Sequence, residues 1–130
     1  RQMCIRDRRK PVVKNLETAA HQQVVLTGGM GRAIARLIHT TRRGEVPDHL
    51  HGLNVDCSDL GHLVKKFSEL SLAARLALPG MDQRRSLHMP LAVAIIRQTM
   101  RSLEAHAAVV ATGGLREGLL AQLMTQQTAA

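Results

Sequence analysis

A glycine-rich turn between an apolar segment and an amphipathic one constrains the fold of this chain most. Residues 24–37 read VVLTGGMGRAIARL, which predicts a buried strand, a Gly-Gly turn and then a helix. A helix N-terminus presents unpaired backbone N–H groups and partial positive charge, and glycines let the backbone approach an anion. The pattern returns at 109–123 as VVATGGLREGLLAQL. Both stretches are therefore typical of a phosphate-binding turn, and the repeat strengthens that interpretation.

The two Val-rich segments, 24–27 and 107–112, are expected to be the strands of an α/β fold. Helices lie between them in the sequence, so a right-handed crossover would make them parallel neighbours. Both Gly-Gly turns would then meet at the sheet edge where ligands of open α/β sheets bind. Two short strands do not form a stable sheet alone, and several helices need more sheet to cover. We therefore expect that upstream strands are missing from this chain.

Apolar residues at three- and four-residue spacings, together with cap residues, predict the helices. A loop over 44–53 and a short extended piece over 53–56 separate the first two. Pro90 lies inside the longest one, so that helix either begins near Pro90 or kinks there. The expected helices cover residues 30–43, which Gly44 ends, a segment beginning at Ser58 or Asp59, residues 72–78, which Ser71 caps, and residues 84–104 and 115–124.

The positive charge is concentrated at the N-terminus. The chain has a formal net charge of +8, and six of its Lys and Arg residues lie in 1–14. The first seven residues, RQMCIRD, resemble a translated sequencing adapter, so 1–7 are expected to be a non-native tail and 8–22 a poorly defined lead-in. Residues 23–124 are expected to form the folded unit and 125–130 a frayed tail. With the charge in the tail, nucleic acid is not an expected partner.

The sequence indicates neither a membrane helix nor a secretory signal. No uninterrupted apolar run approaches the roughly 18 residues that a membrane helix needs. We therefore expect a cytoplasmic protein without a membrane partner. If Cys4 belongs to the adapter-like tail, Cys57 remains as a single thiol, which excludes an intramolecular disulfide and agrees with a reducing compartment.

Dinucleotide binding is one alternative for the first turn. The letters TGGMG resemble the opening of the extended short-chain dehydrogenase pattern, which would make the chain an NAD-binding domain. The third glycine of that fingerprint, where helix and strand pack closely, is replaced by Ile34. No strand ending in an acidic residue follows about 20 residues later, because 46–48 is expected to be a loop. The pattern therefore favours another class of site.

A metal site is a second alternative. Asp48, His49 and His51 lie close together in the expected loop and could join Cys57 as zinc ligands. The chain contains seven histidines, so such proximity arises easily by chance, and no Cys-x-x-Cys or His-Glu-x-x-His pattern supports it. We therefore expect loop or surface histidines and no metal ligands.

A set of short motifs carries a resemblance across most of the chain. Residues 24–37 resemble a Gly-Gly-Thr phosphate turn, and HGL at 51–53 is similar to a His-Gly-Tyr motif. Further matches follow in order: LSLAARLALPGMDQRR at 70–85, MPLAVAI at 89–95 and GLREGLL at 114–120. With these motifs, residues from about 23 to 124 resemble the C-terminal half of the catalytic core of the exopolyphosphatase/guanosine pentaphosphate phosphatase (Ppx/GppA) family. That family belongs to the actin-, Hsp70- and sugar-kinase-like superfamily.

The resemblance implies both a fold and a reaction. The chain would supply the last two strands and helices of a second RNase H-like subdomain, as a fragment of the core. The implied reaction is hydrolysis of terminal phosphoanhydrides in polyphosphate or guanosine pentaphosphate with Mg²⁺. The family's base is a glutamate of the first subdomain, so no catalytic residue is expected here and the fragment alone would be inactive. Implied partners are polyphosphate or guanosine penta- or tetraphosphate and the missing N-terminal subdomain; a homodimer is left open.

The resemblance also implies site residues. Gly28 and Gly29 match the second phosphate turn, and Arg32 either binds phosphate or is a solvated helix arginine. Met30 stands where the family has a threonine hydroxyl, and Leu91 places a bulky side chain where relatives have glycine. These departures keep open a non-catalytic module that binds a nucleotide or polyphosphate. Next to the second turn, Arg116 and Glu117 are expected to lie away from the substrate, and its glycines can serve helix packing alone.

Overall fold

The two repeated Val-rich segments lie side by side in one small sheet. In the computed structural model, which describes residues 23–128, strands β1 (Val24–Leu26) and β3 (Ala107–Val110) pair in parallel, with Val24 opposite Ala108. This confirms the predicted parallel pair and the α/β class. The expectations for residues 1–7 and 8–22 lie outside the described residues.

A third strand completes the sheet of the described region. Strand β2 (Asn54–Asp56) pairs antiparallel with β3, giving the order β1-β3-β2. The sequence predicted an extended piece here but not its place in the sheet. The chain turns at Gly52, where φ is +80°, and Gly52 N–H donates to the Val110 carbonyl at 2.8 Å. Val110 N–H returns a bond of 2.9 Å to Leu53, so the following residues run along β3.

Helices make up most of the rest of the described chain. The first helix, expected over 30–43, begins two residues earlier, because Gly28 and Gly29 already belong to its first helical turn. Gly44 ends it with φ of +79°, as expected for a left-handed cap. The helical elements are α2 (Gly28–Arg43), α3 (Cys57–Glu69), α4 (Leu72–Leu76), the 3₁₀ turn η1 (Gln83–Arg85), α5 (Met89–Ser102) and α6 (Leu115–Thr128).

Two helix boundaries differ from the expectation in an informative way. The predicted helix over 84–104 begins only at Met89, with Pro90 in its first turn, where the missing N–H of proline costs no hydrogen bond. Residues 83–88 form η1 and a turn instead. At the other end, α6 continues to Thr128, beyond the predicted end at Met124. Ser71 caps α4 as predicted, accepting from Ala74 N–H at 3.3 Å.

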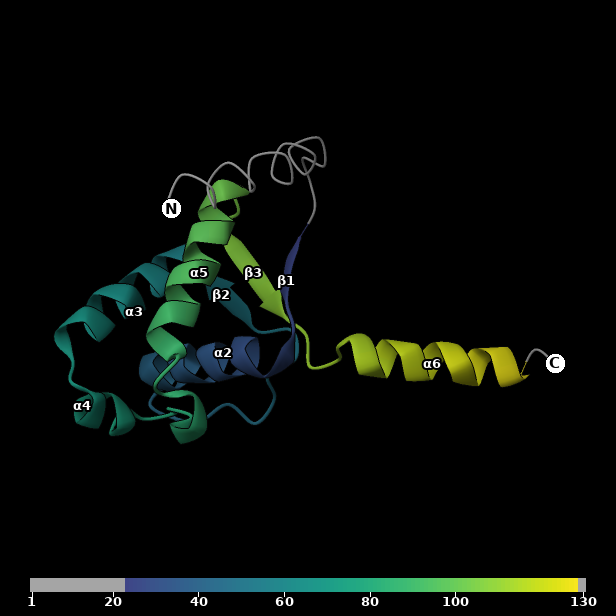
Figure 1. Ribbon diagram of the computed structural model, residues 1–130, viewed down its shortest axis with the longest axis horizontal. Coiled ribbons are helices and arrows are strands. Elements are labelled where there is room, and N and C mark those ends of the chain that lie inside the picture. Colours follow the sequence, from purple (N-terminus) through teal and green to yellow (C-terminus); the bar gives the residue numbers. More distant parts are fainter. Residues whose placement is uncertain (1–22, 129–130) are drawn as a thin grey trace, which may run out of the picture.

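The core lies where α2, α3 and α5 meet the sheet (Figure 1). Helices α3 and α5 pack against each other, and Phe67 is the only aromatic side chain available to fill the space between elements. The interior is therefore aliphatic. The largest fully buried side chains are Ile34, Leu37, Val55, Leu60, Met89, Val93, Met100 and Val110.

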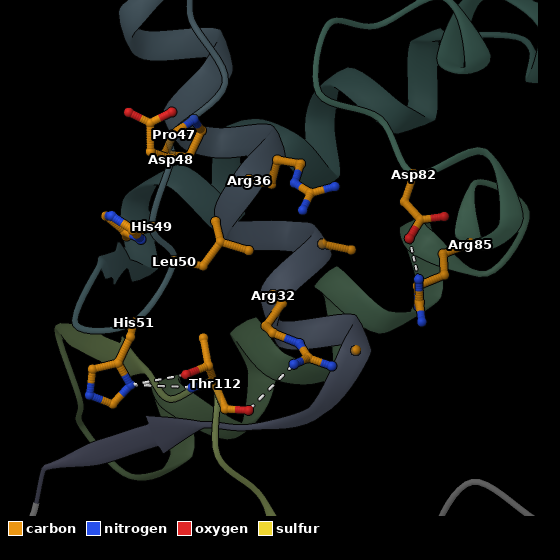
Figure 2. A pocket seen from close by; sticks show the side chains of 12 residues that line it. Arg32, Arg36, Pro47, Asp48, His49, Leu50, His51, Asp82, Arg85 and Thr112 are labelled. Carbon is orange, nitrogen blue, oxygen red and sulfur yellow. Dashed lines mark hydrogen bonds and ion pairs between the residues drawn. The ribbon is translucent and has the colours of Figure 1, made fainter.

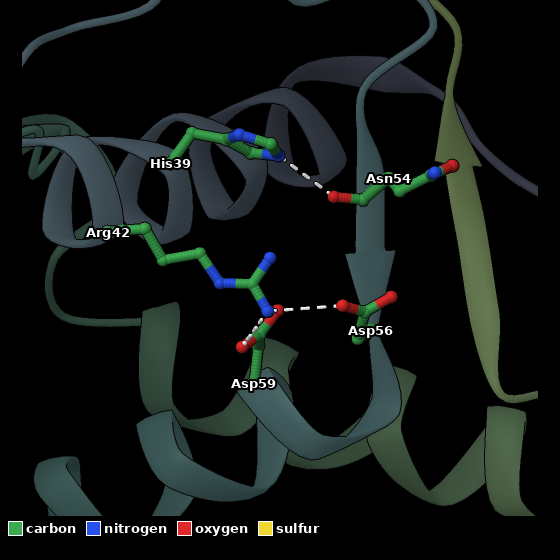
Figure 3. Close-up of polar contacts among 5 residues, drawn as sticks. All are labelled: His39, Arg42, Asn54, Asp56 and Asp59. Carbon is green, nitrogen blue, oxygen red and sulfur yellow. Dashed lines mark hydrogen bonds and ion pairs between the residues drawn. The ribbon is translucent and has the colours of Figure 1, made fainter.

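A polar cluster fastens the C-terminal end of α2 to β2 and α3 (Figure 3). Arg42 donates from Nη2 to Asp56 at 3.1 Å and to Asp59 at 2.6 Å. The hydrogen bond to Asp56 raises the pKa of Arg42 above its ordinary value, and the charge of Asp59 adds to this. The ring of His39, buried on the same helix, hydrogen-bonds through Nε2 to the Asn54 carbonyl at 2.9 Å. These contacts hold α2 at a defined angle across the sheet.

Helix α6 projects away from the remainder of the fold (Figure 1). None of its residues belongs to the buried core of the described region. Leu115 is 80% exposed, and the other large apolar side chains of the helix, Leu119, Leu120, Leu123 and Met124, are 51–62% exposed. Among the described residues, no helix is both long and apolar enough to cross a membrane.

Candidate phosphate site

The N-terminus of α2 has open backbone donors. Gly28 adopts φ of +78°, a left-handed conformation that glycine takes without strain, and this lets the chain pass from β1 into the helix. Thr27, the cap residue, makes no side-chain hydrogen bond to the helix, and the first turn contains no acidic residue. Neither a cap nor a carboxylate therefore satisfies the first N–H groups of α2.

The guanidinium of Arg85 lies against the backbone of Gly29 in the same turn. A Cβ atom placed on Gly29 would lie 2.5 Å from Nη2 of Arg85, so the guanidinium packs onto the bare glycine backbone. Asp82 forms an ion pair with Arg85, and its other oxygen accepts from Arg84 N–H at 3.0 Å. The carboxylate thus orients the guanidinium toward the turn.

These groups open into a cavity of about 520 Å³ (Figure 2). Arg32 and Arg36 project from α2, while Arg85 lies on the opposite side from the loop that carries His49 and His51. Three guanidinium groups therefore face one space, and among the described residues its only acidic lining is Asp48 and the paired Asp82. The other lining residues are Gly29, Ala33, Pro47, Leu50 and Thr112.

Arg32 joins the two repeated turns. Its Nη1 donates to the Thr112 carbonyl at 3.3 Å, which ties the helix after the first Thr-Gly-Gly to the second Thr-Gly-Gly (Figure 2). The backbone N–H of Thr112 donates to Nδ1 of His51, also at 3.3 Å. The bond to Thr112 thus restrains Arg32. Arg32 also lines a smaller cavity of about 430 Å³ between the turns, so it lies at the boundary between the two cavities.

The second turn differs chemically from the first. Glu117 accepts from Gly114 N–H at 2.8 Å and so occupies the backbone donor of this turn with a carboxylate from the same helix. Bonds from its own backbone N–H and from Gly114 lower the pKa of Glu117 below its ordinary value of 4.5, and the charges of Arg32 and Arg116 lower it further. An anion at this turn would have to displace Glu117. The first turn is therefore the better candidate for an anion site.

The structure brings some of the expected site residues together. Gly29 and Arg32 line both cavities, whereas Gly28 lines only the smaller one. Their binding of phosphate stays a prediction. Sequence reasoning did not assign Arg36 and Arg85 to the site. The signal for Arg36 was its position four residues after Arg32, on the same helix face; for Arg85 it was its place in the motif at 70–85.

Three other expectations can be compared with the structure. Among the residues that the structure describes, no three His, Cys, Asp or Glu side chains are placed to hold a metal ion, so the alternative built on Asp48, His49, His51 and Cys57 finds no support. Leu91 is 65% exposed on α5, so it does not crowd a close approach of the backbone. Met30 packs partly buried against the core, which leaves no hydroxyl at that point of the turn.

Comparisons with known proteins agree on one family. The sequence model of the Ppx/GppA phosphatase family matches residues 1–127. No curated protein sequence matches the chain significantly.

Solved structures match the fold at low sequence identity. A Ppx/GppA family member from Aquifex aeolicus aligns with a TM-score of 0.69 and 18% identity, over 98% of this chain and 42% of that one. The type II variant of the Aquifex aeolicus phosphatase aligns with a TM-score of 0.66 and 22% identity, over 85% and 38%. An exopolyphosphatase from Cytophaga hutchinsonii aligns with a TM-score of 0.71 and 22% identity, over 89% and 38%. The chain thus spans about two fifths of the length of these structures.

Proposed function

Because this chain belongs to the Ppx/GppA phosphatase family, we propose that its arginine-lined cavity binds the terminal phosphates of polyphosphate or guanosine pentaphosphate. The observation that carries the proposal is that Arg32, Arg36 and Arg85 line one cavity, which also reaches Gly29 at the uncapped N-terminus of α2. In this role the chain forms one wall of a site for phosphoanhydride hydrolysis.

The chemistry of these groups suits a phosphate. A guanidinium offers a planar fork of N–H donors that matches two phosphate oxygens at once. Backbone N–H groups at the start of α2 add donors, and the partial charge of the helix end has the same sign as the arginines. Gly29 lets the backbone approach the anion. The family match favours this interpretation over the NAD-binding alternative, and the buried Ile34 fills the position where that fingerprint needs glycine.

Hydrolysis also requires a base to activate water, and the described cavity does not offer one. Asp48 is exposed to solvent, and Asp82 is engaged by Arg85 and Arg84. Neither resembles the partly buried carboxylate that general-base catalysis favours. We therefore propose that this chain contributes binding and charge neutralisation, that a residue outside it supplies the base, and that the chain alone is inactive.

The family also implies Mg²⁺, which these residues do not fit. Magnesium binds carboxylate and carbonyl oxygens, whereas this cavity is lined mainly by guanidinium groups. No cluster of three potential ligand side chains occurs in residues 23–128. No step of the proposed role therefore depends on a metal held by this chain.

A binding module without hydrolytic activity is the second candidate function. Met30 favours it, because a methionine packed against the core replaces the hydroxyl that the family turn carries. Phosphate release separates the two candidates. The complete protein should release phosphate from polyphosphate if it is a phosphatase, and should bind the same substrate without release if it is a binding module. Phosphate release by the 130-residue chain alone would contradict a base located elsewhere.

Calorimetric titration tests the binding site directly. The chain should bind tripolyphosphate and guanosine tetraphosphate but not NAD. Arg32→Ala and Arg36→Ala should each weaken binding by about tenfold, because each removes a charge-assisted hydrogen bond. Arg43→Ala is the matched control at the far end of the same helix. Equal weakening by Arg43→Ala, or binding of NAD alone, would contradict the proposal.

A further inference from the structure

We propose that His51 is a positioning residue for the phosphate site: its ring holds the Thr112 segment, and through that segment it holds Arg32. The inference rests on the proposed phosphate-binding function. It concerns a residue that lines the larger cavity and whose ring nitrogen contacts backbone instead of facing a ligand.

The hydrogen-bond ladder between β2 and β3 ends next to His51. Along a strand, alternate N–H groups point to the same side. Val110 N–H points toward β2 and donates to the Leu53 carbonyl at 2.9 Å. Thr112 N–H points the same way, beyond the last β2 pair, and there Nδ1 of His51 accepts it at 3.3 Å. The imidazole therefore takes the place of the next strand carbonyl and continues the ladder by one bond.

Thr112 is in turn linked to Arg32. The Thr112 carbonyl accepts from Nη1 of Arg32 at 3.3 Å. An arginine side chain has several rotatable bonds, and ordering it at the moment of binding costs affinity. A fixed carbonyl partner reduces that cost because it restricts the guanidinium before phosphate arrives. Loss of the His51 contact would leave Thr112, and therefore this partner, free to move.

The bond from Thr112 also fixes the tautomer of the His51 ring. A backbone N–H can donate only to a ring nitrogen that carries no proton, so the contact requires neutral His51 with its proton on Nε2. The adjacent Gly52 adopts φ of +80° and bonds to the Val110 carbonyl, which brings residue 51 to the end of β3. Asparagine carries an amide oxygen close to the position of Nδ1, so it can accept the same bond.

Two variants and one control test the inference on the full chain with tripolyphosphate as the probe. His51→Ala should weaken binding by about two- to tenfold, the effect of ordering one side chain on binding. His51→Asn should restore affinity to within about twofold of wild type, because its amide oxygen replaces Nδ1. His62→Ala is the control, since His62 is exposed on α3 away from the cavity.

Nuclear magnetic resonance tests the contact between His51 and Thr112 itself, while the rescue of affinity by His51→Asn tests its effect on binding. The ¹⁵N shifts of His51 should show a proton on Nε2 and none on Nδ1. Exchange of the Thr112 amide should be slow in wild type and His51→Asn and faster in His51→Ala. A proton on Nδ1, or unchanged affinity in His51→Ala while wild type binds, would overturn the role of His51. Failure of the wild-type chain to bind tripolyphosphate would overturn the proposed function instead, and the ring shifts would still decide whether His51 holds Thr112.

Discussion

Arg85 lies directly over Gly29, so closely that a methyl group on this glycine would be 2.5 Å from Nη2 of the arginine. The atom that would have to move is the far end of a flexible side chain. A side chain at position 29 would therefore displace the guanidinium of Arg85 while leaving the backbone of α2 unchanged.

The first prediction is that Gly29→Ala weakens tripolyphosphate binding without lowering stability. Alanine is the better helix former by about 1 kcal/mol, so the melting temperature should stay unchanged or rise. Displacement of Arg85 should lower affinity, and in an Arg85→Ala background Gly29→Ala should have little further effect, because the two residues act through one contact. Gly118→Ala, at a helical position with open space, is the control. Additive losses in the double variant would contradict this account.

The second prediction concerns acid and the start of α6. The folded-state pKa of Glu117 lies below its ordinary value of 4.5, so the ionised carboxylate stabilises the helix start. Between the folded pKa of Glu117 and its unfolded value of 4.5, the unfolded state binds more protons than the folded state. The stabilisation by ionised Glu117 is therefore fully present above about pH 4.5 and is lost as the pH falls through the folded pKa. The protection of the Gly114 amide, taken as its exchange rate relative to the intrinsic rate at the same pH, should fall over that range in wild type. In Glu117→Gln the protection should already be low and show no such step. Identical acid responses of the two proteins would show that the Gly114 bond does not depend on the charge of Glu117.

The third prediction addresses the cluster at the end of α2. Arg42→Ala should lower the free energy of unfolding by about 0.5–1 kcal/mol, since Arg42 is 45% exposed and water screens its ion pairs. Arg43→Ala is the control, because Arg43 is the exposed neighbour outside the cluster. Denaturant unfolding at low and high salt measures both. The difference between the variants should shrink at about 1 M salt, where the screening length falls to about 3 Å; a difference that grows with salt would rule out an electrostatic origin.

Local signals in the sequence were sufficient for most of the fold. The alternation of apolar runs with Thr-Gly-Gly predicted β1, β3 and the helices that follow them. Ser71 and Gly44 were recognised as caps because their chemistry acts within one helical turn. These elements depend on neighbours within a few residues, which a sequence displays directly.

The remaining features depend on contacts between distant segments. The pairing of β2 arises from a turn at Gly52 and bonds to Val110, which no local pattern encodes. Arg85 reaches the site because Asp82 orients it and because Gly29 has no side chain. The sequence assigned phosphate binding to the first Thr-Gly-Gly turn and not to the second, but it did not show that Glu117 accepts a hydrogen bond from Gly114 N–H.

The last prediction is that the isolated chain self-associates through α6. Its leucines are largely exposed, with Leu119 at 51% and Leu123 at 58%, on a helix that projects from the fold. Contiguous exposed apolar surface of this kind promotes association. The double variant Leu119→Glu with Leu123→Glu should shift the chain toward the monomer in sedimentation velocity. Gln122→Glu, which adds charge at a polar position of the same helix, should not. A monomeric wild-type chain, or equal effects of both variants, would show that these leucines do not drive association.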